Sequence, residues 1–170
     1  MSLREVFAFP EAVNDYAARC PAGLVVTLAV VTMLAPPPAQ TWLAAALVVG
    51  FALRVAGGPR YSPFGRLSVH VLAPRVSSEP KLVAGAPKRF AQTIGLVMSS
   101  VALGLFLGGL TGAGVVVLGV LVAAALAEAA LGFCLGCWMY GQLQRVGVVS
   151  EDAGVDCADI WARPGMTARN

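Results

Sequence analysis

Two cysteines three residues apart are the part of the sequence with the clearest chemistry. Cys134 and Cys137 lie in the run GFCLGCW over residues 132–138, and a helix would place their sulfurs about one turn apart on one face. A dithiol of this kind can cycle to a disulfide, carry a persulfide or supply two metal ligands. The spacing therefore predicts a thiol site at Cys134 and Cys137.

The chain has two further cysteines, Cys20 and Cys157. The predicted membrane topology puts all four thiols on one side of the membrane. Cys20 or Cys157 could therefore react with Cys134 and Cys137. Four thiolates would also complete a tetrahedral metal site. A third interpretation is that the cysteines are small apolar side chains packed in a helix contact. The sequence leaves these three interpretations open.

The elements that must position the thiols are apolar helices. Hydrophobic residues make up 58% of the 170 residues, charged residues make up 12%, and the mean hydropathy is +0.76. A soluble domain of this size has too little interior for that much apolar surface, so the excess must face lipid or a large partner. We predict a single integral membrane domain over residues 1–170, built as an all-α, four-helix transmembrane bundle of two helical hairpins.

Proline, glycine and basic segments separate the predicted helices. The three prolines at 36–38 cannot continue a helix, and Thr111–Gly114 is predicted to be a turn. A span needs about 20 residues, so the first two helices are short for crossing a bilayer. The predicted boundaries are 20–35, 41–56, 90–110 and 113–144 for the helices, 57–89 for a basic loop and 145–170 for a tail.

Basic residues are confined to one side of this topology. Of the twelve Lys and Arg residues, eleven lie in the N-terminal segment, the loop or the tail, and Arg54 is inside a predicted helix near the same side. Cytoplasmic loops of membrane proteins carry such an excess. We therefore predict a multi-pass protein of the cell membrane with both termini cytoplasmic. The net charge of +3 follows this membrane pattern, and we predict no nucleic-acid partner.

Two charges lie inside predicted helices. Counted from the outer turns, Arg54 and Glu128 are both roughly 20 Å deep at 1.5 Å per residue. Charges at such depths are costly unless paired, so we predict an intramembrane ion pair that is either structural or part of a proton or anion path. Helical phase predicts that Glu128 faces away from Cys134 and Cys137.

Glycines at four-residue spacing predict close helix contacts. Such faces pack helices within one bundle or join two copies of a protein, so a homo-oligomer is one predicted assembly. The sequence contains no phosphate loop, H-E-x-x-H or G-x-S-x-G motif, and we predict no cofactor. The glycines concerned are Gly104, Gly108 and Gly112 in the third predicted helix and Gly132 and Gly136 in the fourth.

Three short stretches together resemble a known family. They are RYSP over residues 60–63, PKRFAQ over 87–92 leading to Gly95, and GFCLGC over 132–137 with Tyr140. In combination they resemble a family of small actinobacterial integral membrane proteins of unknown function, over roughly residues 10–145. The resemblance implies a membrane location and an association with thioredoxin-like and sulfurtransferase proteins.

These observations favour a protein that presents the Cys134 and Cys137 dithiol at the cytoplasmic side of the membrane. There it would exchange a disulfide or a persulfide sulfur with a thioredoxin-like or sulfurtransferase partner. The alternative is a non-catalytic membrane scaffold or small transporter subunit, and the third interpretation is a Cys-rich metal site. Whether the protein is an enzyme stays open between these interpretations.

Overall fold

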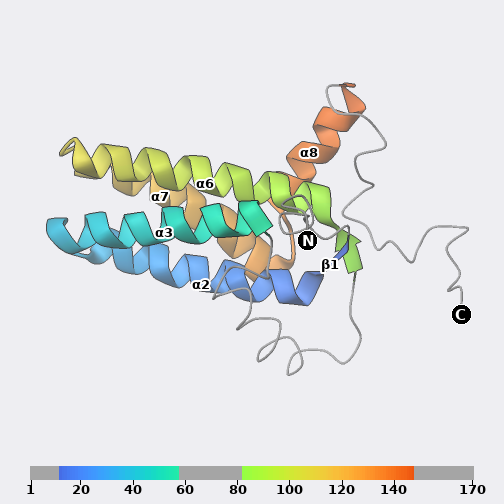
Figure 1. The fold of residues 1–170 in the computed structure, drawn as a ribbon, viewed down its shortest axis with the longest axis horizontal. Helices are drawn as coiled ribbons and strands as arrows, with labels where there is room; N and C mark the ends of the chain where they lie inside the picture. Colours follow the sequence, from blue (N-terminus) through green and yellow to red (C-terminus); the bar gives the residue numbers. More distant parts are fainter. Residues whose placement is uncertain (1–11, 58–81, 148–170) are drawn as a thin grey trace, which may run out of the picture.

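The computed structural model describes residues 12–57 and 82–147, and these residues are mainly helical. The long helices α2, α3, α6 and α7 lie side by side, while α8 turns away from them at one end (Figure 1). The helical class predicted from the sequence is confirmed for these residues. The elements in chain order are β1 (Ala12–Asn14), α2 (Asp15–Leu34), α3 (Pro37–Gly57), β2 (Leu82–Ala84), α6 (Gly85–Leu107), α7 (Thr111–Leu126), the π-helix η3 (Ala127–Leu131) and α8 (Leu135–Arg145).

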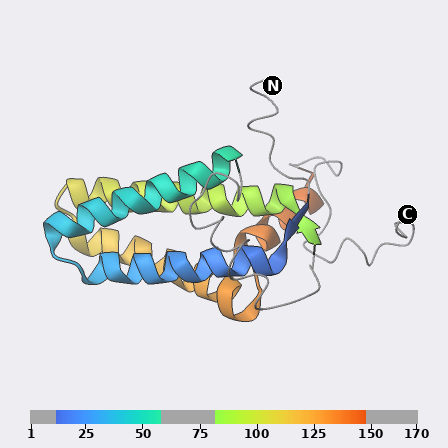
Figure 2. The same ribbon diagram turned by 60° about the horizontal axis from the view of Figure 1, so that its bottom comes forward.

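A short antiparallel ribbon, which the sequence did not predict, joins β1 to β2. The backbone of Ala12 pairs with that of Ala84, and Asn14 pairs with Leu82. The ribbon lies beyond the end of the bundle at which α8 departs (Figures 1 and 2). It therefore ties the start of α2 to the start of α6 near the candidate site.

The prolines after α2 open the next helix as well as ending the previous one. Helix α3 begins at Pro37, four residues before the predicted start, because proline at the first helical position loses no intrahelical hydrogen bond. The amide of Gln40 donates to the carbonyl of Pro36 at 2.9 Å, which closes the first turn. The predicted boundary at Thr41 is therefore wrong.

The turn between α6 and α7 precedes the predicted turn. Gly109 has φ +75°, a conformation that glycine adopts without strain, and it ends α6. Thr111–Gly114 then forms the first turn of α7.

Helix α6 also begins earlier than predicted, at Gly85, so Lys88 belongs to a helix and the basic loop is shorter than 57–89. Residues 58–81 of that loop lie outside the described residues.

The predicted helix over 113–144 is broken into three pieces. Helix α7 widens into η3, and Gly132 then adopts a left-handed conformation at φ +69°. The amide of Phe133 donates to Ala127 O at 3.1 Å and that of Gly132 to Glu128 O at 3.0 Å. Each bond spans one residue more than at an ordinary helix end closed by glycine, as the wider π-helix requires. Cys134 is extended, and α8 begins after it. The single long helix is therefore wrong, because a glycine C-terminus interrupts it.

Small residues let the helices pack closely in the interior. Ala29, Ala44, Ala102 and Leu118 are fully buried at the centre of the core. The space over Gly95 is filled by the ring of Phe51, and that over Gly114 by the ring of Phe106. Among the glycines predicted to make helix contacts, Gly104 and Gly112 face open space. These two do not pack inside the bundle.

Three helices of the described residues are long and apolar enough to cross a membrane: Pro37–Gly57, Ala86–Leu107 and Thr111–Leu131. Only 17–28% of each apolar window is buried inside the bundle. Large apolar side chains such as Trp42, Val49, Val101 and Val116 point outward, which is stable only against lipid or another apolar surface. The apolar stretch Pro21–Leu34 of α2 is shorter.

Candidate thiol site at the end of the bundle

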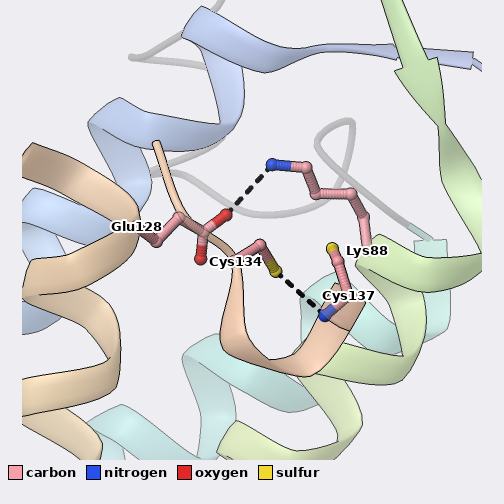
Figure 3. Close-up of polar contacts among 4 residues, drawn as sticks. All are labelled: Lys88, Glu128, Cys134 and Cys137. Carbon is pink, nitrogen blue, oxygen red and sulfur yellow. Dashed lines mark hydrogen bonds and ion pairs between the residues drawn. The ribbon is translucent and has the colours of Figure 1, made fainter. Parts of the chain in front are cut away.

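The two thiols lie where α8 leaves the bundle (Figure 3). Cys134 is the residue before the first turn of α8, and its Sγ accepts a hydrogen bond of 3.3 Å from the amide of Cys137. Both cysteines are buried, with 9% and 3% exposure. Cys134 precedes α8 and Cys137 lies in its first turn, so the helix begins between two cysteines that lie close together.

Helix α8 is held against the start of α6 by two contacts. A Cβ on Gly136 would collide with Ala91, so the two backbones touch there. The rings of Phe90 and Tyr140 pack with centroids 5.5 Å apart at 57°. These four residues belong to the stretches 87–92 and 132–140 singled out in the sequence. The two stretches therefore meet in space and fix the position of the thiols.

A buried ion pair lies beside the thiols. Lys88 Nζ is 3.1 Å from Glu128 Oε1, and the side chains are 6% and 21% exposed. The sequence did not identify Lys88 as a partner, since it placed this residue in a loop. An earlier start of α6 would have put Lys88 at the same level as Glu128.

The sequence paired Arg54 with Glu128, and the structure brings both residues to one cavity. Arg54 is buried, its guanidinium lies 5.9 Å from the centre of the Phe51 ring, and it interacts electrostatically with Glu128. One carboxylate thus lies close to two cationic side chains, Arg54 and Lys88. The equal depths predicted for Arg54 and Glu128 from the sequence are consistent with their shared position at this cavity.

Glu128 lies with the thiols, which corrects the prediction from helical phase. Glu128 and Cys134 line the same cavity, and Figure 3 shows their side chains on neighbouring parts of the chain. The phase argument assumed a continuous α-helix of 3.6 residues per turn. The π-helix and the glycine turn at Gly132 change the direction of the chain between the two residues.

The cavity has a volume of about 300 Å³ and is bordered by α2, α3, α6, α7 and α8. Its polar side chains are Arg54, Lys88, Gln92 and Glu128, with Cys134 at one side. Within the described residues, the buried Oε1 of Gln92 has no hydrogen-bond donor. The apolar lining includes Val25, Phe51, Ile94, Met98 and Leu121.

The side chains of the other two cysteines lie outside the part of the chain that the structure describes. These are Cys20, which belongs to α2, and Cys157. Among the residues that are described, no group of three or more His, Cys, Asp or Glu side chains is arranged to hold a metal ion. The four-cysteine metal site therefore stays a prediction.

The helices and their exposed apolar surface define a helical membrane protein whose polar residues and thiols gather at one end of the bundle. The chain belongs to the family described as Domain of unknown function (DUF4395), which matches residues 13–145. This agrees with the resemblance to an uncharacterised family seen in the sequence. No curated protein and no solved structure matches the chain.

Proposed function

We propose that this membrane protein carries out thiol–disulfide or persulfide exchange at Cys134 and Cys137 with a thioredoxin-like or sulfurtransferase partner. The proposal is carried by one observation: the amide of Cys137 donates a hydrogen bond to Cys134 Sγ at the start of α8. Amide groups at a helix N-terminus favour negative charge on an atom held there. The thiolate is the nucleophilic form of cysteine, so Cys134 is the attacking thiol.

The exchange with a disulfide balances in two steps. The Cys134 thiolate attacks one sulfur of the partner's disulfide, and the other sulfur leaves as a thiolate. Cys137 then loses its proton and attacks Cys134 Sγ, which forms an intramolecular disulfide and releases the partner's second thiol. The partner gains two electrons, and the Cys134–Cys137 pair loses two.

The exchange with a persulfide needs only the first thiol. The Cys134 thiolate attacks the outer sulfur of the partner's persulfide, and the partner leaves as a thiolate. Cys134 then carries the transferred sulfur until a second acceptor thiolate removes it. In this reaction no net oxidation occurs, and Cys137 contributes its backbone amide rather than its sulfur.

We place the site on the cytoplasmic side. Arg54 lies in the last turn of α3, and Lys88 and Arg89 lie in the first turn of α6. These helix ends are at the end of the bundle where α8 departs (Figure 1), and positive charge favours the cytoplasmic side. In this proposal α2, α3, α6 and the α7–η3 helix all cross the membrane as two hairpins, with both termini cytoplasmic.

Differential alkylation with mass spectrometry tests the exchange. The reduced protein is incubated with an oxidised thioredoxin-like protein or a persulfide donor, and free thiols are alkylated before and after reduction with reagents of different mass. We expect a Cys134–Cys137 disulfide in the first case and one added sulfur on Cys134 in the second. Cys137→Ser should trap a mixed disulfide on Cys134, whereas Cys134→Ser should trap none. Two thiols that stay unmodified under both treatments contradict the proposal.

A scaffold or small transporter subunit is the second candidate. It is favoured by the buried cluster of Arg54, Lys88 and Glu128, because ionisable side chains within membrane helices often mark ion or substrate paths. The open faces of Gly104 and Gly112 would suit a homo-oligomer. The double variant Cys134→Ser, Cys137→Ser separates the candidates, since a scaffold retains its role without the thiols.

A further inference from the structure

We propose that the cavity beside Cys134 binds a single-chain lipid with a phosphate monoester head, such as an alkyl or prenyl phosphate. The proposal uses the cavity and its charged side chains and does not depend on thiol exchange. At about 300 Å³ the cavity is at the small end of the range of ligand pockets. A cavity of this volume can hold the phosphate head group and the first part of the hydrocarbon chain of such a lipid.

The apolar part of the cavity suits a hydrocarbon chain. Val25, Phe51, Met98 and Leu121 line it from four different helices. The outer surfaces of these helices are apolar and largely exposed, so lipid surrounds the bundle. A hydrocarbon chain in this part of the cavity would therefore contact apolar side chains from all four helices.

The charged part of the cavity suits an anionic head. Arg54 and Lys88 bring two positive charges and Glu128 brings one negative charge, and all three line the cavity. Burying a net charge among apolar side chains is costly unless an opposite charge accompanies it. Among the described side chains that line the cavity, these three sum to one positive charge, which a head with one negative charge complements. Guanidinium and ammonium groups both bind phosphate oxygens well.

Gln92 favours a phosphate monoester over a carboxylate. Its Oε1 is buried at the cavity and has no hydrogen-bond donor among the described residues, and a buried unsatisfied acceptor is costly. A singly protonated phosphate monoester has one P–OH, which can donate to this oxygen, and two further oxygens that accept from Lys88 and Arg54. A carboxylate has no hydrogen to donate.

Bound lipid would also cover Cys134, since this residue lines the same cavity. A phosphate near Cys134 would shield its sulfur sterically. Occupancy of the cavity is therefore expected to slow alkylation of Cys134, and the effect provides a second readout of binding at this position.

Binding is tested on the full-length protein in an uncharged detergent by native mass spectrometry. The probes are dodecyl phosphate, dodecanoate and dodecanol, which share one chain and differ in the head. We expect one dodecyl phosphate per protein, weaker retention of dodecanoate and no retention of dodecanol above background. Equal retention of all three, or none of any, overturns the proposal. Stronger binding of dodecanoate than of dodecyl phosphate overturns the phosphate assignment.

Variants locate the binding site. Gln92→Leu removes the acceptor and should weaken dodecyl phosphate binding about tenfold while changing dodecanoate binding little. Arg54→Gln should weaken both anions. Arg145→Gln is the matched control, because Arg145 is exposed at the end of α8 and does not line the cavity. Thermal unfolding of each variant checks that it is folded, and the comparison of probes on the unaltered chain needs no variant.

The outcome separates this inference from the exchange proposal. Binding is repeated with the double variant Cys134→Ser, Cys137→Ser, which should retain dodecyl phosphate. If the unaltered protein exchanges thiols but does not bind dodecyl phosphate, only the lipid site is contradicted. If it binds dodecyl phosphate but its thiols are unreactive, only the exchange proposal is contradicted. Binding that is insensitive to both Gln92→Leu and Arg54→Gln places the lipid elsewhere and contradicts the site proposed here.

Discussion

Gly136 and Ala91 are in backbone contact. A Cβ built on Gly136 would lie 2.5 Å from Ala91 Cβ and 2.6 Å from Ala91 Cα, closer than carbon atoms can pack. Helix α8 turns away from the long helices (Figure 1), and it packs against the start of α6. This one glycine therefore decides how closely the thiols at the start of α8 can approach α6.

Gly136→Ala should push α8 away from α6. Overpacking in a tight contact costs typically about 1–3 kcal/mol, and we expect a lower unfolding temperature in detergent together with faster alkylation of the buried Cys137. Gly141→Ala is the control, because Gly141 lies in the same helix with no atom near its missing Cβ. Alanine there should be neutral or stabilising by up to about 1 kcal/mol. Equal behaviour of the two variants would show that the contact does not position α8.

Cys134 has a structural role that serine can take over. Its Sγ accepts the amide of Cys137 at the N-terminus of α8, as a serine Oγ does at other helix starts. We expect Cys134→Ser to preserve the unfolding temperature and Cys134→Ala to cost about 1 kcal/mol. Thermal unfolding in one detergent measures both. If serine destabilises as much as alanine, the hydrogen bond contributes nothing, and its support for a nucleophilic Cys134 is lost.

Lys88 and Glu128 should depend on each other. Glu128→Gln leaves two cationic side chains beside a neutral amide, and breaking a buried pair in this way costs roughly 3 kcal/mol. The double variant Lys88→Met, Glu128→Gln removes both charges and, compared with the single variants Lys88→Met and Glu128→Gln, should recover part of that loss. A double-mutant cycle on the free energy of unfolding gives the coupling between the residues. Additive effects would mean that the 3.1 Å contact does not stabilise the bundle.

The sequence predicts the positions of the helices better than their ends. Long uncharged apolar runs have few alternatives to a helix, so α3, α6 and α7 are found within a few residues. The break after α7 is hidden, because Ala127–Leu131 continues the same apolar composition and only Gly132 marks it. Proline at 37 ends one helix in the prediction and opens another in the structure, since a missing amide is harmless at a helix start.

The candidate site could be predicted in its residue types more readily than in its geometry. Two thiols at C-x-x-C spacing and a buried acid are visible in the sequence. Their meeting is not, because it requires the turn at Gly132 that directs Cys134 toward Glu128. Lys88 and Gln92 lie in the stretch 87–92 that carries the family resemblance, but only the packing of α6 against α7 and α8 assigns their side chains to the cavity.

Sidedness is tested with single reporter cysteines in a chain whose four native cysteines are changed to serine. Gly112→Cys lies in the exposed first turn of α7, where a side chain meets no other atom, and Arg145→Cys lies at the exposed end of α8. The basic residues predict that the end carrying α8 is cytoplasmic. A membrane-impermeant maleimide added to intact cells should therefore label Gly112→Cys and leave Arg145→Cys unlabelled until the cells are opened. The reverse pattern would put the thiols on the outer face, where a cytoplasmic exchange partner has no access to them.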